Sequence, residues 1–199
     1  MEVVLDKQYP VAAGTDAAWT VLSNMHELAT CMPGAQITED IDATHYKGSV
    51  RVKVGPAVAA FAGTIEVLAI DPTNRMLKMI GKGADKGGSS ASMELTARLV
   101  PADNGHSTLE GHAEVIVNGK FAQFGGRMMT SVSDMILAQF AEVFSQKAQA
   151  MQSASAPAAA GAASAAAPAA PVVAKEFNAL GLVWALVKNF FASLFGRKA

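Results

Sequence analysis

The sequence predicts an α+β fold in which a curved antiparallel sheet of about six or seven strands wraps around a long C-terminal helix. Three observations support this prediction. An alternating segment at residues 3–11 is followed by two short helical segments. Between residues 36 and 117 the chain forms a run of strand-like segments separated by turn signals, and such neighbouring strands pair antiparallel. From Phe121 onwards, apolar residues recur at helical spacing over about seven turns.

The N-terminal part of the chain is predicted to contain one strand and two short helices. Residues 3–11 form the strand. Thr15 is a suitable N-cap for the first helix and places Asp16 in its first turn, where a carboxylate is favourable. The second helix is predicted over residues 25–31 and ends before Pro33-Gly34.

The middle of the chain is predicted to form the rest of the sheet. From Val50 to Val54, valines alternate with basic residues, which is the pattern of a half-buried strand. Gly55-Pro56 and residues 71–74 are turn signals between strands. The predicted strands are residues 36–41, 45–54, 58–70, 75–82, 90–100 and 107–117.

Two glycine-rich sites interrupt the predicted elements. The stretch 81–88 lacks the Lys-Ser/Thr ending and the following helix of a phosphate-binding P-loop, so it predicts a wide hairpin between two strands. Gly125-Gly126 lie near the start of the predicted long helix, where each glycine costs up to about 1 kcal/mol relative to alanine. Two interpretations remain for this pair: close packing on the sheet, or room for a ligand.

The chain divides into a folded domain at residues 1–151, a linker at residues 152–174 and a C-terminal segment at residues 175–199. The linker is a low-complexity run of Ala, Pro and Ser whose prolines break helical structure. A disordered coil of this length has a mean end-to-end distance of roughly 25–30 Å. The linker would therefore hold the domain about one domain diameter from whatever binds the C-terminal segment.

The C-terminal segment predicts an amphipathic helix that binds a membrane. Its length of about 20 residues permits a membrane span, but Lys188 near its middle brings the insertion free energy close to zero. We therefore expect the helix to lie in the membrane interface, with Lys188 reaching the headgroups. A spanning helix, or a helix that docks in a groove of a partner protein, is the alternative. The predicted membrane-binding residues are Phe177, Leu180, Trp184, Val187, Lys188, Phe191, Leu194, Phe195, Arg197 and Lys198.

Charge and cysteine content restrict the partners and the compartment. Residues 1–151 carry 12 Lys and Arg against 16 Asp and Glu, whereas residues 152–199 carry 4 against 1. A mildly acidic domain disfavours nucleic acid as a partner, and a basic apolar segment suits an anionic membrane surface. The single cysteine, Cys31, and an N-terminus without a long apolar stretch indicate a reducing compartment and no signal peptide. We expect a cytoplasmic protein, peripheral on the inner face of the cell membrane.

No pattern in the sequence specifies a catalytic or metal site. The four histidines lack ligand spacing with the cysteine or a carboxylate, so no metal is expected. A nucleophilic pair of Cys31 and His26 is an alternative, but a single cysteine near a helix end more often has a structural role. Tyr46, Arg98 and Arg127 are the polar candidates for an enzyme site, and they are few and scattered.

Methionine and glycine content favour an apolar ligand cavity between the sheet and the long helix. The chain has 10 methionines, and several lie on segments predicted to face the interior, where the flexible thioether side chain fills irregular space. Ordinary core packing is the alternative. The predicted cavity residues are Val52, Phe61, Ile65, Met79, Gly81, Met93, Leu95, Val115, Phe124, Gly125, Met128, Met129, Val132 and Met135.

Five short motifs lie along the folded part of the chain. They are CMPGA at residues 31–35, GSVRVKVG at 48–55, FxG at 61–63, GKGxDxGGS at 81–89 and NGKxAQFGxR at 118–127. Taken together they resemble the CoxG family of carbon monoxide dehydrogenase proteins over residues 1 to about 150, and the linker with its hydrophobic C-terminus also resembles that family. The resemblance implies the helix-grip fold of the superfamily (SRPBCC) that includes START and birch-pollen-allergen-like domains. It also implies association with molybdenum hydroxylase-type dehydrogenases and a role in attaching the CO-oxidising enzyme to the cytoplasmic membrane.

From the residues and the resemblance together, we expect a non-enzymatic accessory protein of a molybdenum-dependent CO dehydrogenase. The C-terminal segment would bind the inner leaflet, and the domain would bind the dehydrogenase and an apolar ligand. A respiratory quinone, menaquinone or ubiquinone, is the expected ligand because the electrons of such an enzyme must reach the membrane. No covalently bound cofactor is expected. The alternatives are a membrane-recruitment scaffold without a ligand and an enzyme of the polyketide cyclase type.

Overall fold

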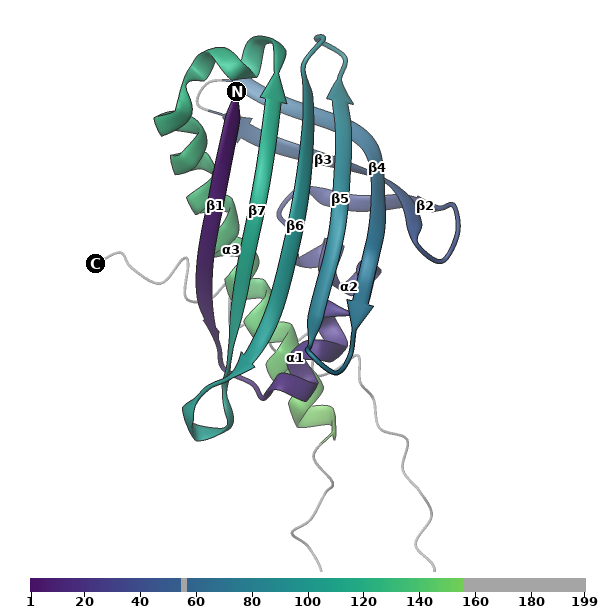
Figure 1. Cartoon of the computed structure of the whole chain (residues 1–199), viewed down its shortest axis with the longest axis vertical. Helices are drawn as coiled ribbons and strands as arrows, with labels where there is room; N and C mark the ends of the chain where they lie inside the picture. The colour runs from purple at the N-terminus through teal and green to yellow at the C-terminus, as the bar shows by residue number, and fades with distance from the viewer. Residues whose placement is uncertain (55–56, 156–199) are drawn as a thin grey trace, which may run out of the picture. The chain divides into compact units, whose positions relative to one another are not determined.

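A computed structural model describes residues 1–54 and 57–155 of the chain (Figure 1). The predicted C-terminal segment and the linker from residue 156 onwards lie outside the described residues. The strands are β1 Glu2–Val11, β2 Ala35–Asp40, β3 His45–Val54, β4 Ala57–Asp71, β5 Met76–Asp85, β6 Ser90–Pro101 and β7 Ser107–Asn118. The helices are α1 Thr15–Leu22, α2 Met25–Cys31 and α3 Gly126–Ser155, with short 3-10 turns η1 Asp103–Gly105 and η2 Gly119–Phe124.

The seven strands form one antiparallel sheet in the order β1-β7-β6-β5-β4-β3-β2. The first strand therefore pairs with the last one, and the other strands follow one another as a meander. One face of the sheet carries α3, and α1 and α2 lie toward the end of the domain where α3 finishes (Figure 1). The structure confirms the predicted α+β fold, a curved antiparallel sheet around a long C-terminal helix.

The first helix begins one residue earlier than predicted. Gly14, and not Thr15, is the N-cap of α1, because Thr15 already has helical geometry. No side chain caps the N-terminus of this helix. Instead, the Gly14 N–H donates a hydrogen bond to Oε1 of Gln152 at 2.7 Å, and the Ala12 N–H donates to Oγ of Ser145 at 3.0 Å. These two bonds attach the chain before α1 to the C-terminal half of α3.

The glycine-rich stretch 81–88 forms a hairpin between two strands as predicted, but the hairpin is narrower than predicted because residues 81–85 belong to β5. β5 continues through Gly81 and Gly83 to Asp85, and a short turn then leads into β6. The Asp85 carboxylate accepts a hydrogen bond from the Ser89 N–H at 2.8 Å, which closes this turn. Glycines lack the side chains that give a strand its sequence pattern, but their backbones pair with β4 and β6 like those of other residues.

The long helix begins at Gly126 and not near Phe121 as predicted. Residues Gly119–Phe124 form a 3-10 turn, and Gly125 has a φ of 77°, which interrupts the right-handed helical geometry. No heavy atom lies within 4 Å of a Cβ placed at Gly125 or Gly126. The prediction that these two glycines allow close packing on the sheet is therefore wrong.

The hydrophobic core lies at the end of the domain that carries α1 and α2. Phe144 and Ala148 of α3 are fully buried there, together with Leu22 of α1 and Leu77 and Leu99 of the sheet. The buried residues of α3 all belong to its C-terminal half. That half of the helix is therefore fixed on the sheet by dense packing, in which even small volume changes are costly.

A row of three glycines lets the sheet bend over toward α3. Gly48, Gly63 and Gly83 lie opposite one another on β3, β4 and β5. A Cβ at Gly63 would lie 1.9 Å from the carbonyl oxygen of Lys82 and 2.6 Å from the Cα of Gly83. β4 curves from its pairing with β3 into its pairing with β5 (Figure 1). The bend therefore requires a residue without a side chain at position 63.

Gly63→Ala is expected to destabilise the domain by roughly 2–4 kcal/mol, because the backbone of β5 would have to move away from the new methyl group. The matched control is Gly81→Ala, also in a strand, where the new Cβ would meet only Cε of Met93 at 3.9 Å. This control should change stability by less than about 1 kcal/mol. Urea unfolding followed by circular dichroism measures both variants, and equal midpoints for the two would contradict the steric explanation.

Candidate ligand-binding region between the sheet and the long helix

The N-terminal half of α3 lies over a part of the sheet whose inner face is only half-buried. The register places Ile65, Gly81, Met93 and Val115 side by side on β4, β5, β6 and β7, as one row across this face. All four are half-buried although they lie on central strands, whereas Leu77 on the same face is fully buried. α3 therefore covers this row only in part, which is unusual for apolar residues at the centre of a covered sheet.

Six of the predicted cavity residues meet around one buried aromatic side chain, Phe121 of η2. The rings of Phe61 and Phe124 lie 5.8 and 6.0 Å from the Phe121 ring, measured between centroids. Phe121 forms a buried group with Ala59 and Val117, which we call the Phe121 group. The half-buried residues packed on it are Val52, Phe61, Ala91, Val115, Phe124, Met129 and Val132. Phe121 and Ala91 were not among the predicted residues, because position 121 was assigned to the first turn of the helix.

Three further predicted residues border the main core. Ile65, Met79 and Leu95 are half-buried and pack against its fully buried side chains. They continue the half-buried inner face from the Phe121 group toward α1. The candidate region thus extends along the sheet from η2 to the edge of the main core.

The structure does not bring three of the predicted residues into this region as buried groups. Gly125 is exposed, and Met128 and Met135 are 37% and 51% exposed. The two methionines are seven residues apart, so they share one face of α3. They lie at the exposed border of the face through which Met129 and Val132 pack on the Phe121 group.

An ion pair at the β1 edge adds polar groups that the sequence analysis missed. Nζ of Lys7 lies 2.8 Å from Oδ1 of Asp134, which joins the inner side of β1 to α3. The hydrogen bond with Asp134 raises the pKa of Lys7, and burial raises the pKa of the neighbouring inner-face Tyr9. The alternation of Leu5, Lys7 and Tyr9 along a strand is the signal that places Lys7 on the inner face.

Cys31 and His26 do not form a nucleophilic pair. Cys31 is buried, and its Sγ donates a hydrogen bond to the carbonyl oxygen of Glu27 at 3.4 Å. Burial raises the pKa of the Cys31 thiol to about 11. The exposed His26 instead places its Nε2 3.0 Å from Oδ2 of Asp40. The thiol is therefore protonated at neutral pH and is a poor nucleophile.

The polar candidates for an enzyme site do not converge. The hydroxyl of the half-buried Tyr46 donates to the carbonyl oxygen of Ala43 at 3.1 Å. Arg98 is exposed between the buried Ala97 and Leu99, so it lies on the outer face of β6. Arg127 is exposed in the first turn of α3. The three side chains thus have different surroundings.

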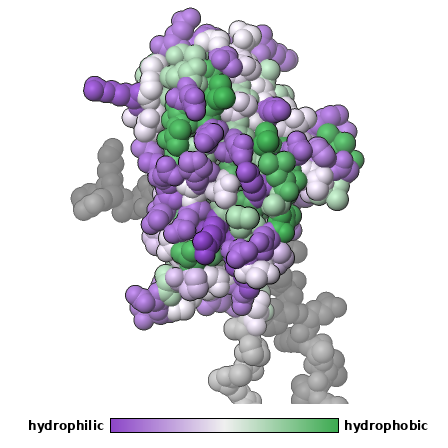
Figure 2. Space-filling view, in the orientation of Figure 1, coloured by the Kyte–Doolittle hydropathy of each residue, from purple (hydrophilic) through white to green (hydrophobic). Residues whose placement is uncertain are grey.

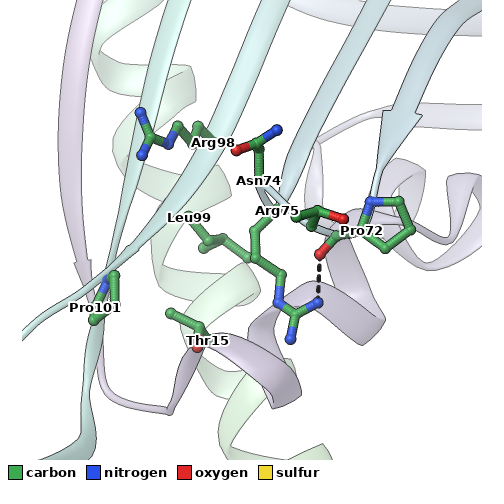
Figure 3. A pocket seen from close by; sticks show the side chains of 8 residues that line it. Thr15, Pro72, Asn74, Arg75, Arg98, Leu99 and Pro101 are labelled. Atoms are coloured by element: carbon green, nitrogen blue, oxygen red, sulfur yellow. Dashed lines mark hydrogen bonds between the residues drawn. The ribbon is translucent and has the colours of Figure 1, made fainter.

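A separate depression of about 420 Å³ lies at the end of the domain that carries α1 (Figure 3). Nη1 of Arg75 donates to the carbonyl oxygen of Pro72 at 2.6 Å, and Arg75 also pairs with Asp16. Its lining combines Thr15, Pro72, Thr73, Asn74, Arg75, Arg98, Leu99 and Pro101. Because polar groups make up about as much of the lining as apolar ones, this depression does not match the expected apolar ligand.

Two further searches concern only residues 1–54 and 57–155. No group of His, Cys, Asp or Glu side chains in this part of the chain is placed to hold a metal ion. No helix within it is long and apolar enough to cross a membrane. The predicted membrane-binding residues lie beyond the described range, so their role stays a prediction.

Cys31 should react with iodoacetamide a few hundredfold more slowly in the native protein than in urea at pH 8. A thiol with a pKa of about 11 is only about 0.1% thiolate at that pH, against roughly a quarter for an unperturbed thiol. Mass spectrometry of quenched time points measures both rates on the same preparation. Similar rates in the native and the unfolded protein would show that the thiol is accessible and ionised.

Comparison with known proteins agrees with this geometry. The CoxG family of carbon monoxide dehydrogenase subunits matches residues 8–149. A conserved protein from Geobacillus kaustophilus superposes with a TM-score of 0.65 at 19% identity, over 75% of this chain and 96% of that one. The Zhui aromatase/cyclase from Streptomyces sp. R1128 gives a TM-score of 0.56 at 15% identity, over 75% and 94% of the two chains.

A START superfamily protein from Mycobacterium smegmatis gives a TM-score of 0.53 at 14% identity, over 74% of this chain and 98% of that one. At these identities the structural neighbours show the fold alone. Comparison with curated protein sequences gives no match. The family match covers most of the folded domain, and the chain therefore belongs to the CoxG family of carbon monoxide dehydrogenase subunits.

Proposed function

We propose that this CoxG protein carries an apolar ligand, a respiratory quinone, between the cytoplasmic membrane and a molybdenum-dependent CO dehydrogenase, without catalysing a reaction itself. The half-buried row of Ile65, Gly81, Met93 and Val115 carries this proposal. It presents apolar side chains beside a position without a side chain, under a helix that covers the row only in part. Such a surface suits a slender apolar ligand.

The chemistry of the region suits a quinone in two respects. The half-buried row and the phenylalanines around Phe121 offer the apolar contacts that an isoprenoid chain requires. The flexible side chains of Met93 and Met129 can adapt to its shape. At the β1 edge, the Lys7 ammonium and the Tyr9 hydroxyl are hydrogen-bond donors that a quinone carbonyl can accept from. The family links the chain to an enzyme whose electrons must reach the membrane.

Two observations favour a carrier over an enzyme of the cyclase type. Tyr46, Arg98 and Arg127 do not converge, and the Cys31 thiol is buried and protonated. The likeness to an aromatase/cyclase rests on 15% identity and concerns the fold. Organic extraction of the purified full-length protein followed by mass spectrometry tests the carrier directly. A stoichiometric quinone is the expected result, and an extract without quinone would favour the recruitment scaffold.

Gly81→Leu should lower the affinity for a short-chain quinone at least about tenfold, a change of about 1.4 kcal/mol. The leucine would occupy the open space in the row, since a Cβ at Gly81 meets only Cε of Met93 at 3.9 Å. The affinity follows from the rise in thermal midpoint with quinone concentration, because a ligand of the native state stabilises it. Thr64→Leu is the control, because it adds the same side chain at an exposed position of neighbouring β4. Equal affinities for the two variants would place the ligand elsewhere.

Deleting residues 175–199 should abolish flotation of the protein with vesicles of neutral phosphatidylcholine while the domain stays folded. A milder variant, with Trp184 and Phe191 both changed to Ser, should weaken binding strongly, since each side chain loses up to roughly 1.5–3 kcal/mol of burial. Flotation assays and circular dichroism measure binding and folding on the same samples. Undiminished flotation of the deleted protein would contradict the assignment of the tether.

A further inference from the structure

Charge is distributed very unevenly along the domain. We define the basic end as residues 1–4, 51–62, 82–93 and 115–131. It holds six basic residues and two acidic ones, Glu2 and Asp85, whereas the rest of residues 1–155 holds six basic and fourteen acidic residues. The basic residues of this end are Arg51, Lys53, Lys82, Lys86, Lys120 and Arg127. A domain that is acidic as a whole is therefore positive at one end.

The segments of the basic end meet in space. Ser90 of β6 pairs with Asn118 of β7, and Nζ of Lys120 lies 3.1 Å from Oδ2 of Asp85 and 5.1 Å from the Phe121 ring centre. In Figure 1 the β5–β6 turn, η2 and the start of α3 lie at the upper end, opposite α1 and the β6–β7 connection. All six basic side chains are exposed.

Apolar groups accompany the charge at this end. Val58 is 52% exposed next to the β3–β4 turn, and Met128 is exposed in the first turns of α3. Figure 2 shows hydrophobic side chains on the upper part of the molecule, on the side where Figure 1 draws β1 and β7. Val4 of β1 and Ile116 of β7 are exposed. The Phe121 group of the candidate ligand region lies within this same end. Basic residues interspersed with exposed apolar ones are typical of surfaces that bind anionic lipid.

We infer that the basic end of the domain docks on an anionic lipid bilayer, so that the candidate ligand region faces the membrane from which it takes its ligand. The inference rests on the proposed carrier function and adds a second membrane contact, independent of the C-terminal segment. An anionic leaflet attracts the positive end and repels the acidic remainder, so the charge asymmetry also orients the domain. Six basic residues are within the range of known lipid-binding clusters.

The length of the chain permits this orientation. α3 ends at Ser155, at the end of the domain opposite the basic end, and its 30 residues span about 45 Å. The 19 residues from 156 to 174 can span at most about 65 Å. A domain tethered through residues 175–199 can therefore still place its basic end on the same membrane.

Orientation is measured on the full-length protein with an environment-sensitive thiol probe at Lys86→Cys or, as the control, at Asp103→Cys in the β6–β7 connection. The buried Cys31 leaves these as the reactive thiols. On vesicles of phosphatidylcholine with phosphatidylglycerol, the probe at position 86 should shift to shorter emission wavelength and the probe at position 103 should not. An equal or larger shift at position 103, or no shift at either position while flotation shows the protein bound, would overturn the inference.

A second experiment separates the position of the charge from its amount. Lys53, Lys86 and Arg127 are changed together to Glu, and the control changes Lys47, Lys78 and Arg98 to Glu with the same change in net charge. The first set should reduce the gain in vesicle affinity that phosphatidylglycerol gives by roughly fivefold or more per residue, and the control should keep most of it. Equal losses in both sets would overturn the inference.

The remaining outcomes distinguish this inference from the proposed function. If the first set leaves vesicle binding intact but prevents electron transfer from the dehydrogenase, the basic end binds a protein and the inference fails. Quinone affinity in detergent should be the same for the variant with Lys53, Lys86 and Arg127 changed to Glu and for the unmodified protein, since these three residues do not belong to the half-buried row. If the unmodified protein binds no quinone in detergent but the two probes behave as expected, the carrier function fails and the membrane orientation stands.

Discussion

The bend of the sheet depends on positions that carry no side chain. Gly48, Gly63 and Gly83 lie opposite one another, and backbone atoms of β5 occupy the place where a side chain at Gly63 would be. Because β4 can turn there, Val52 of β3 reaches the Phe121 group together with Val115 of β7. β3 and β7, which lie toward opposite edges of the sheet, thus pack on one buried group, and the inner face becomes concave. The candidate ligand region is a consequence of this concavity.

The two halves of α3 differ in how tightly they pack on the sheet. The C-terminal half carries Phe144 and Ala148 into the main core, where dense packing supplies stability. The N-terminal half lies over residues that are only half-buried, such as Met93, and this looser packing contributes less to stability. Separation along one helix allows the domain to combine a stable fold with a less tightly packed region. The charge asymmetry follows the same division, since the basic residues gather at the half-buried end.

Periodicity predicted the fold because alternation in strands and helical spacing in α3 are direct results of burial on one side. Periodicity failed at glycines, because a glycine has no side chain to show which strand face it occupies or whether its φ is positive. β5 therefore runs further than predicted, through Gly81 and Gly83, and α3 begins later than predicted, after Gly125. Of the candidate region, the strand residues were placed well, because alternation assigns their face. Met128 and Met135 were not, since apolar residues on adjacent sides of the helix, such as Met128 and Met129, leave the side that faces the sheet ambiguous. The Lys7–Asp134 pair required knowing which elements are neighbours in space.

Because the C-terminal half of α3 is fixed on the sheet, any tilt of this helix would pivot near Phe144. Gly126 is about 27 Å from that residue along the helix axis, so a tilt of about 5° displaces the start of the helix by about 2 Å. That displacement is roughly the van der Waals radius of a methyl group. Substitutions among the tightly packed residues around Phe144 can thus resize a distant region that they never touch. Ligand preference in such a protein can diverge between relatives while every residue that lines the region stays the same.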